Sequence, residues 1–160
     1  MPQMVEIRQD WLWIWELLAL IALIIMGAVM VILPDLLEFM GEETYDAIVG
    51  SGAYTAMSSE ERQAHDWLLA VLGSVMIGWG VTSAFIVWFG FRQWIIQEFS
   101  REHEWTWQAL LAGLTVWFIF DTGISAWNEV WFNVILNTVL FIVLIIPLVA
   151  ASPKYLQNRK

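Results

Sequence analysis

The sequence predicts an all-α integral membrane protein with four transmembrane helices packed in a bundle. Its 160 residues are 59% hydrophobic and 14% charged, with a mean hydropathy of +0.65, whereas a soluble domain carries about a quarter charged residues. The charges gather in a few short stretches. Between them lie uncharged runs of the length that a helix needs to cross ~30 Å of hydrocarbon: Leu17 to Leu33, Trp67 to Phe91, Trp105 to Phe120 and Val130 to Ser152.

We expect a single membrane domain over residues 1–160. Within it, an outer loop at about 34–65 joins the first two spans and an inner loop at about 92–104 joins the second and third. The third run reaches span length only if Asp121 is counted, which places this carboxylate within the membrane. The expected spans are about 11–33, 66–91, 105–126 and 130–151.

The basic residues predict the orientation of the chain. Six of the seven lysines and arginines lie in the N-terminal segment, the second loop and the C-terminal tail, and only Arg62 lies in the first loop. In a four-span chain those three segments share one side of the membrane. The positive-inside rule therefore places both termini in the cytoplasm, with the protein in the plasma (bacterial inner) membrane. The N-terminus lacks a signal-cleavage pattern, so we expect the first span to be retained.

Tryptophans mark the start of the first span. Trp11, Trp13 and Trp15 indicate an interfacial anchor, and an aromatic surface that contacts a pigment, a lipid or a quinone is the alternative. Glu16 follows just inside the interface, where an unpaired carboxylate is costly. Arg92 ends the second span at a comparable depth. We therefore predict a structural ion pair between Glu16 and Arg92.

The first loop carries eight acidic residues between Pro34 and Asp66. A loop of this length in a small protein usually has structure of its own, so we expect a structured acidic outer loop. The sequence Ser58-Ser-Glu-Glu61 has the spacing of a helix-capping box. The acidic residues do not follow a calcium-loop pattern, and no metal site is expected.

Small residues recur at helical spacing in the second and third spans. Ser74-xxx-Gly78, Gly80-xxx-Ala84 and Ala109-xxx-Gly113 each let two helix backbones approach closely. We expect these two spans to be in contact, either inside the bundle or at an interface formed by self-association or with other membrane subunits.

The third and fourth spans carry a group of polar residues. If Trp127 and Trp131 mark the outer interface, Asp121 and Asn137 each lie ~9 Å deep and meet at one level. Ser125 and Asn133 stack above them on the same helix faces. Such a cluster either binds the helices together, binds a small polar or amphipathic ligand, or handles protons or ions.

Several functions are excluded by missing residues. The absence of cysteine excludes thiol chemistry, no histidine lies within a span to hold a haem, and no phosphate-binding, nucleophile-elbow or zinc-protease motif occurs. No basic helix suggests nucleic acid. We expect no cofactor and no catalytic residue.

The leading hypothesis is therefore a non-catalytic accessory or scaffold subunit of a membrane assembly. A small ligand-binding or transport protein with a site around Asp121 and Asn137 is the alternative. A membrane enzyme acting on a lipid or quinone is third, because only Asp121 and Glu16 offer acid–base groups.

Overall fold

The computed structural model describes the backbone of residues 2–97 and 101–152, and the side chains of 11–97 and 102–152. This part of the chain is helical and contains no strand. The elements are α1 (Pro2–Ile32), η1 (Pro34–Leu37), α2 (Glu38–Val49), α3 (Ser59–Ile86), η2 (Val87–Phe91), α4 (Arg92–Ile96), η3 (Arg101–His103), α5 (Glu104–Trp127) and α6 (Trp131–Ala150).

Four helical segments are long and apolar enough to cross a membrane, as the sequence predicted. They cover Trp11–Ile32, Ser59–Ile96, Glu104–Trp127 and Trp131–Ala150. The second segment passes without a break from α3 through η2 into α4, beyond the end predicted at Phe91. Trp94 and Ile95 of α4 are buried, and this apolar burial extends the helix past Arg92.

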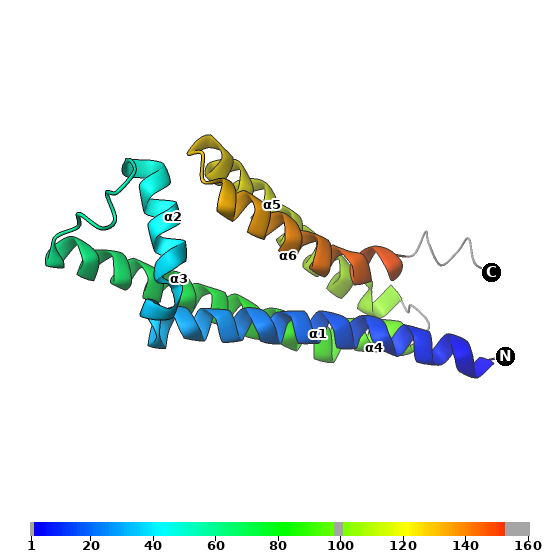
Figure 1. Cartoon of the computed structure of the whole chain (residues 1–160). Helices are drawn as coiled ribbons and strands as arrows, with labels where there is room; N and C mark the ends of the chain where they lie inside the picture. Colours follow the sequence, from blue (N-terminus) through cyan, green and yellow to red (C-terminus); the bar gives the residue numbers. More distant parts are fainter. Residues whose placement is uncertain (1, 98–100, 153–160) are drawn as a thin grey trace.

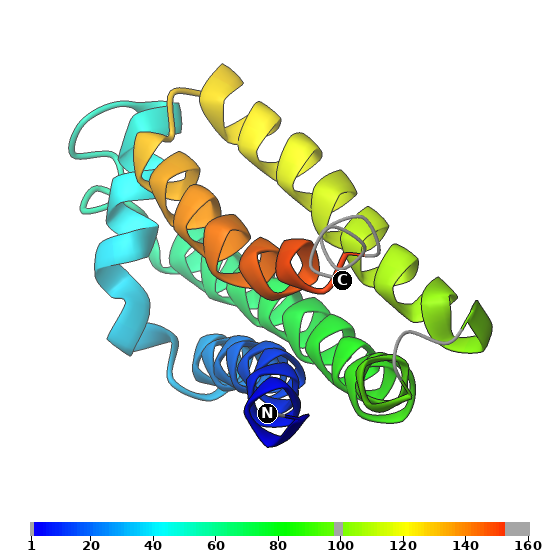
Figure 2. The same cartoon turned by 90° about the vertical axis from the view of Figure 1, so that its right-hand side faces the viewer.

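The four long helices form two pairs. α1 lies beside α3 along most of its length, and α5 lies beside α6 (Figure 1). The pairs converge where α1 begins and α6 ends, which we call the packed end, and they diverge at the splayed end. Here α2 runs from the end of α1 toward the turn between α5 and α6 (Figure 2), and Phe39 meets Phe132 with ring centroids 6.2 Å apart.

The hydrophobic core lies toward the packed end. Val87, Phe91 and Leu148 are fully buried there, and residues of all four long helices contribute to the cluster. Burial of such side chains supplies about 1.5–3 kcal/mol each in water-soluble proteins. Between two helices in lipid the gain comes from close packing instead.

Glycines set the contact between α1 and α3. A Cβ added to Gly73 would stand 2.5 Å from the carbonyl oxygen of Gly27, and one added to Gly27 would stand 2.6 Å from that of Gly73. Gly80, seven residues on, lies against Ile24. The contact predicted from the small residues of α3 therefore forms mainly with α1, whereas a Cβ added to Gly78 or Gly113 would meet no atom of a neighbouring element within 4 Å.

The π-helical turn η2 brings the continuation of α3 against α5. A π turn inserts one residue into the helical repeat and so rotates every following side chain around the axis. Within it, Gly90 approaches Thr106 so closely that a Cβ would overlap the threonine methyl group. The turn itself contacts both α1 and α5, and α4 beyond it continues to pack against α1.

Two tryptophans compensate for carbonyls that α6 cannot satisfy itself. Pro147 has no N–H to donate to Val143, four residues earlier, and the indole N–H of Trp15 donates to the Val143 carbonyl at 2.9 Å. At the end of α6, the indole of Trp107 donates to the Leu148 carbonyl at 2.7 Å. These rings therefore fix α6 to α1 and α5, a role beyond the interfacial belt that the sequence predicted.

The segment between α1 and α3 is held by polar contacts. Asp46 accepts the amide N–H groups of Gly52 and Tyr54 at 2.7 and 2.8 Å, and these bonds hold the pKa of its carboxyl below the ordinary value of 3.8. The predicted capping box is confirmed, because Ser58 accepts from the Glu61 amide while the Glu61 carboxylate accepts from the Ser58 amide.

Candidate functional site

The polar cluster predicted at the α5–α6 turn forms in part. Asn133 donates from Nδ2 to Ser125 Oγ at 2.7 Å and to Asp121 Oδ1 at 3.3 Å. Ser125 in turn donates to the backbone carbonyl of Asp121, four residues earlier on α5, at 2.7 Å. One amide of α6 thus joins two side chains of α5.

Asn137 does not join this cluster. It is 2% exposed, and its Nδ2 has no hydrogen-bond partner. Its place on α6 explains the difference, because Val130, Asn137 and Leu144 follow at intervals of seven and are all buried. We expected Asp121 and Asn137 to meet at one level. The hydrogen bond to Asp121 instead comes from Asn133, which lies one turn nearer the start of α6.

The geometry of this cluster is that of a clip between two helices. The Asn133 amide donates across to α5, and the Ser125 hydroxyl donates to the preceding turn of its own helix. Such bonds between helices contribute about 0.6 kcal/mol each in a membrane protein. Ligand binding at Asp121, Ser125, Asn133 and Asn137 stays a prediction.

A second polar site lies closer to the packed end, around Glu16. This residue of α1 is 3% exposed, although it carries a carboxyl group. It lines a cavity of about 110 Å³. The other lining residues come from α1, α3, α5 and α6, and none is charged: Leu20, Trp79, Thr82, Ser83, Ile86, Ala109, Leu110, Gly113, Leu114 and Leu144.

The structure does not bring together Glu16 and Arg92. Within the described side chains, these two form no ion pair, and Oε2 of Glu16 has no hydrogen-bond partner. The Arg92 guanidinium instead lies 5.3 Å from the ring centroid of Trp13 and 5.1 Å from that of Trp88. Trp13 precedes Glu16 by three residues, so Arg92 packs against α1 about one turn away from the carboxylate.

The cavity lies along a lightly packed line between α3 and α5, which we call the α3–α5 seam. We define it by four exposed small residues, Gly78 and Thr82 on α3 with Ala109 and Gly113 on α5. Thr82 donates its hydroxyl proton to the Gly78 carbonyl at 2.9 Å, so its proton is not directed at Glu16. The seam therefore combines closely approachable backbone with a buried carboxylate at its base.

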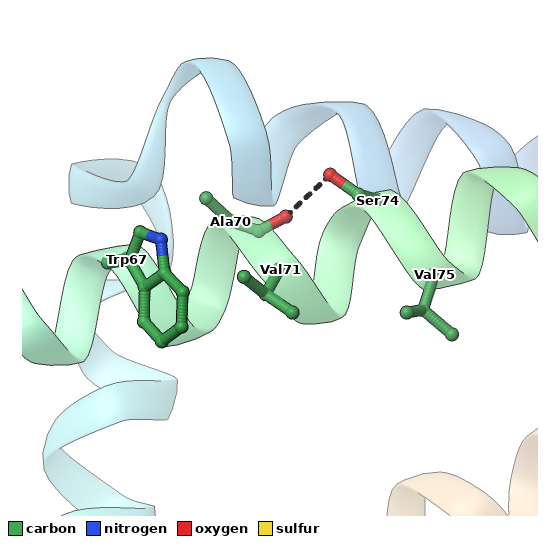
Figure 3. Close-up of a pocket in the computed structure, with 5 residues that line it drawn as sticks. All are labelled: Trp67, Ala70, Val71, Ser74 and Val75. Carbon is green, nitrogen blue, oxygen red and sulfur yellow. Dashed lines mark hydrogen bonds between the residues drawn. The ribbon is translucent and has the colours of Figure 1, made fainter.

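A larger hollow lies on α3 toward the splayed end and is shallow and open. It has a volume of about 470 Å³ and is lined by Trp67, Ala70, Val71, Ser74 and Val75. Figure 3 shows the Ser74 hydroxyl turned back to the Ala70 carbonyl of its own helix, at 2.8 Å. Its proton is thereby used within α3. The lining is otherwise apolar, as on a helix face that meets lipid.

The described residues contain no group of three or more His, Cys, Asp or Glu side chains that could hold a metal ion. Comparisons of the chain with protein families, with curated proteins and with solved structures gave no significant match. The two polar sites are therefore the features of the chain that bear on its function.

Sequence reasoning identified Glu16 but missed its cavity. The ion-pair hypothesis compared the depths of two residues and not their directions around the helix axes. A signal was available in α1, where Glu16, Leu20, Leu23, Gly27 and Met30 recur every three or four residues and all are buried. This spacing places Glu16 on the packing face of α1.

Proposed function

We propose that the protein is a non-catalytic subunit of a membrane assembly and that the α3–α5 seam receives a transmembrane helix of a companion protein. The observation that carries this proposal is the unpartnered Glu16 carboxylate at the base of the seam. A lipid chain offers this oxygen no hydrogen bond, and each unsatisfied polar group in hydrocarbon costs several kcal/mol. A helix with a donor side chain removes that cost.

The shape of the seam supports the same proposal. Gly78 and Gly113 have open space where a Cβ would stand, and glycine and alanine on exposed faces let a further helix approach closely. Close packing of helix backbones is a main source of helix association in lipid.

The competing functions find less support. A cavity of about 110 Å³ is well below the roughly 300–1,000 Å³ of a pocket for a drug-sized ligand, which argues against a quinone or lipid substrate at Glu16. Asp121 lies seven residues beyond Leu114, a lining residue of this cavity, hence about 10 Å further along α5. The two carboxyl groups thus belong to separate sites, which weakens the enzyme hypothesis.

The test is native mass spectrometry of the protein extracted from its own membrane in mild detergent with lipids retained. We expect a companion chain at fixed stoichiometry. A solitary monomer or homodimer under these conditions would refute the proposal.

Two glycines of α5 provide a matched pair of variants. Gly113 and Gly123 are both exposed, and a Cβ added to either would meet no atom of a neighbouring element within 4 Å, but only Gly113 lines the seam. Gly113→Leu should fill the seam and displace the companion, whereas Gly123→Leu should retain it. Equal recovery of the companion with both variants would place the interface elsewhere.

A further inference from the structure

We infer that the helix received by the seam carries a lysine or arginine within the membrane and that this cation pairs with Glu16. The inference rests on the proposed function and names the chemistry of the companion. It begins from a carboxylate that is 3% exposed and has no basic neighbour among the cavity residues.

Removing a carboxylate from water without a partner is among the largest costs that a fold can carry. Within the described side chains, two candidate partners of Glu16 are engaged elsewhere. Thr82 uses its proton within α3, and Arg92 lies over two tryptophan rings. Ser83, the second hydroxyl of the lining, is buried but forms no hydrogen bond with Glu16 within the described side chains. A positive charge or a strong donor from another chain would supply the missing interaction.

Of its basic residues, a second copy of this protein brings Arg92 near that depth, but this guanidinium already lies over Trp13 and Trp88 of its own chain. Glu16 is five residues inside the Trp11–Ile32 segment, about 8 Å from its end. The uncharged runs from Leu17 to Leu33, Trp67 to Phe91, Trp105 to Phe120 and Val130 to Ser152 contain no lysine or arginine. The occupant is thus a different protein.

The size of the cavity selects the kind of group. About 110 Å³ holds one alkylammonium or guanidinium group with its last methylenes, and is too small for a headgroup with acyl chains. A divalent ion needs several oxygen ligands from the protein, and Glu16 is the only carboxylate in the lining. A basic side chain on a companion helix fits the cavity volume and needs no oxygen ligand other than Glu16.

The experiment uses the complex purified from its own membrane, with the companion sequenced and the recovery of each chain measured. We expect a lysine or arginine inside a transmembrane segment of the companion, about one and a half turns from the membrane face nearest to Glu16. Glu16→Gln should lower recovery of the companion at least tenfold. Asp121→Asn, the same change at the other membrane-embedded carboxylate, should leave recovery unchanged.

A second variant protects the test against misfolding. Changing the basic residue of the companion to methionine leaves this chain intact and should lower recovery to the same extent as Glu16→Gln. A cysteine introduced at Gly113, in a chain that has no cysteine of its own, should cross-link to a cysteine one turn from that basic residue.

The two proposals fail differently. A companion that lacks a basic residue within the membrane, or that is recovered equally with Glu16→Gln, overturns the charge pairing and leaves the subunit proposal standing. Absence of any companion overturns the subunit proposal, and the charge pairing with it.

Discussion

Replacing Trp15 by phenylalanine tests whether its indole N–H stabilises the Val143 carbonyl, which Pro147 leaves without a donor within α6. The bond from Trp15 Nε1 to the Val143 carbonyl is 2.9 Å long. Side-chain hydrogen bonds in membrane proteins contribute about 0.6 kcal/mol on average and up to about 1.7, and a buried carbonyl without a partner costs about 1–3 kcal/mol. We therefore expect Trp15→Phe to lower the free energy of unfolding by about 1–2 kcal/mol.

A double-mutant cycle separates this bond from the loss of ring packing. In a Pro147→Ala background, residue 147 regains an N–H that can donate to the Val143 carbonyl within α6. Trp15→Phe should then cost about 1 kcal/mol less than in the unmodified chain, because the carbonyl keeps a partner. Reversible unfolding in mixed micelles of increasing SDS fraction measures all four proteins.

Trp107→Phe is the control for this cycle. Trp107 donates to the Leu148 carbonyl at the end of α6, where the loss of helical partners does not depend on Pro147. Its cost should therefore be the same in both backgrounds. If Trp15→Phe also costs the same with proline and with alanine at position 147, the proposed relation between Trp15 and Pro147 is wrong.

Five further substitutions test the helix contacts, the loop and the clip between α5 and α6. Gly73→Ala should lose about 1–3 kcal/mol in SDS unfolding, because its Cβ would meet a backbone carbonyl of α1 at 2.5 Å; Gly78→Ala, in open space, should be neutral or gain up to about 1 kcal/mol. Asp46 has a lowered pKa in the folded state, so its stabilisation is present above the ordinary pKa and is lost as the pH falls through the folded value. The protection factors of the Gly52 and Tyr54 amides, which compare hydrogen exchange with the intrinsic rate at each pH, should fall over that acidic range, and Asp46→Asn should abolish this pH dependence. Asn133→Leu should cost about 1 kcal/mol by removing two bonds, and Asp121→Asn less, because an acceptor oxygen remains; equal costs in thermal unfolding would contradict this account of the clip.

The class of the fold could be predicted because it depends on composition and length alone. Four apolar segments between charged stretches predict four helices of spanning length, and the structure contains four helices long and apolar enough to span a membrane. The capping box at Ser58 was likewise predictable, since both of its bonds are local in sequence.

The pairing of the helices was harder to predict because it depends on rotation about each axis. Gly73 and Gly80 face α1, and the small residues of the seam remain exposed. The π turn at Val87–Phe91 shifts this rotation partway along one helix, and periodicity does not reveal where the extra residue lies.

The role of Pro147 could have been anticipated from sequence in part. A proline inside a span leaves the carbonyl four residues earlier without its donor, so a partner for Val143 was required. Which of the 12 tryptophans supplies it follows only from the packing of α1 against α6.

The pairing of α1 with α3 and of α5 with α6 has a consequence for the order of assembly. Each pair joins consecutive membrane spans, and the α5–α6 connection is only three residues long, Asn128 to Val130. Short closures are entropically cheap, so each hairpin can insert and pack before the two hairpins meet. Coexpressed halves, 1–97 and 101–160, should then reassemble, and failure to copurify would count against this order. Contact between the hairpins would form last, and until then Glu16 would remain accessible from the side.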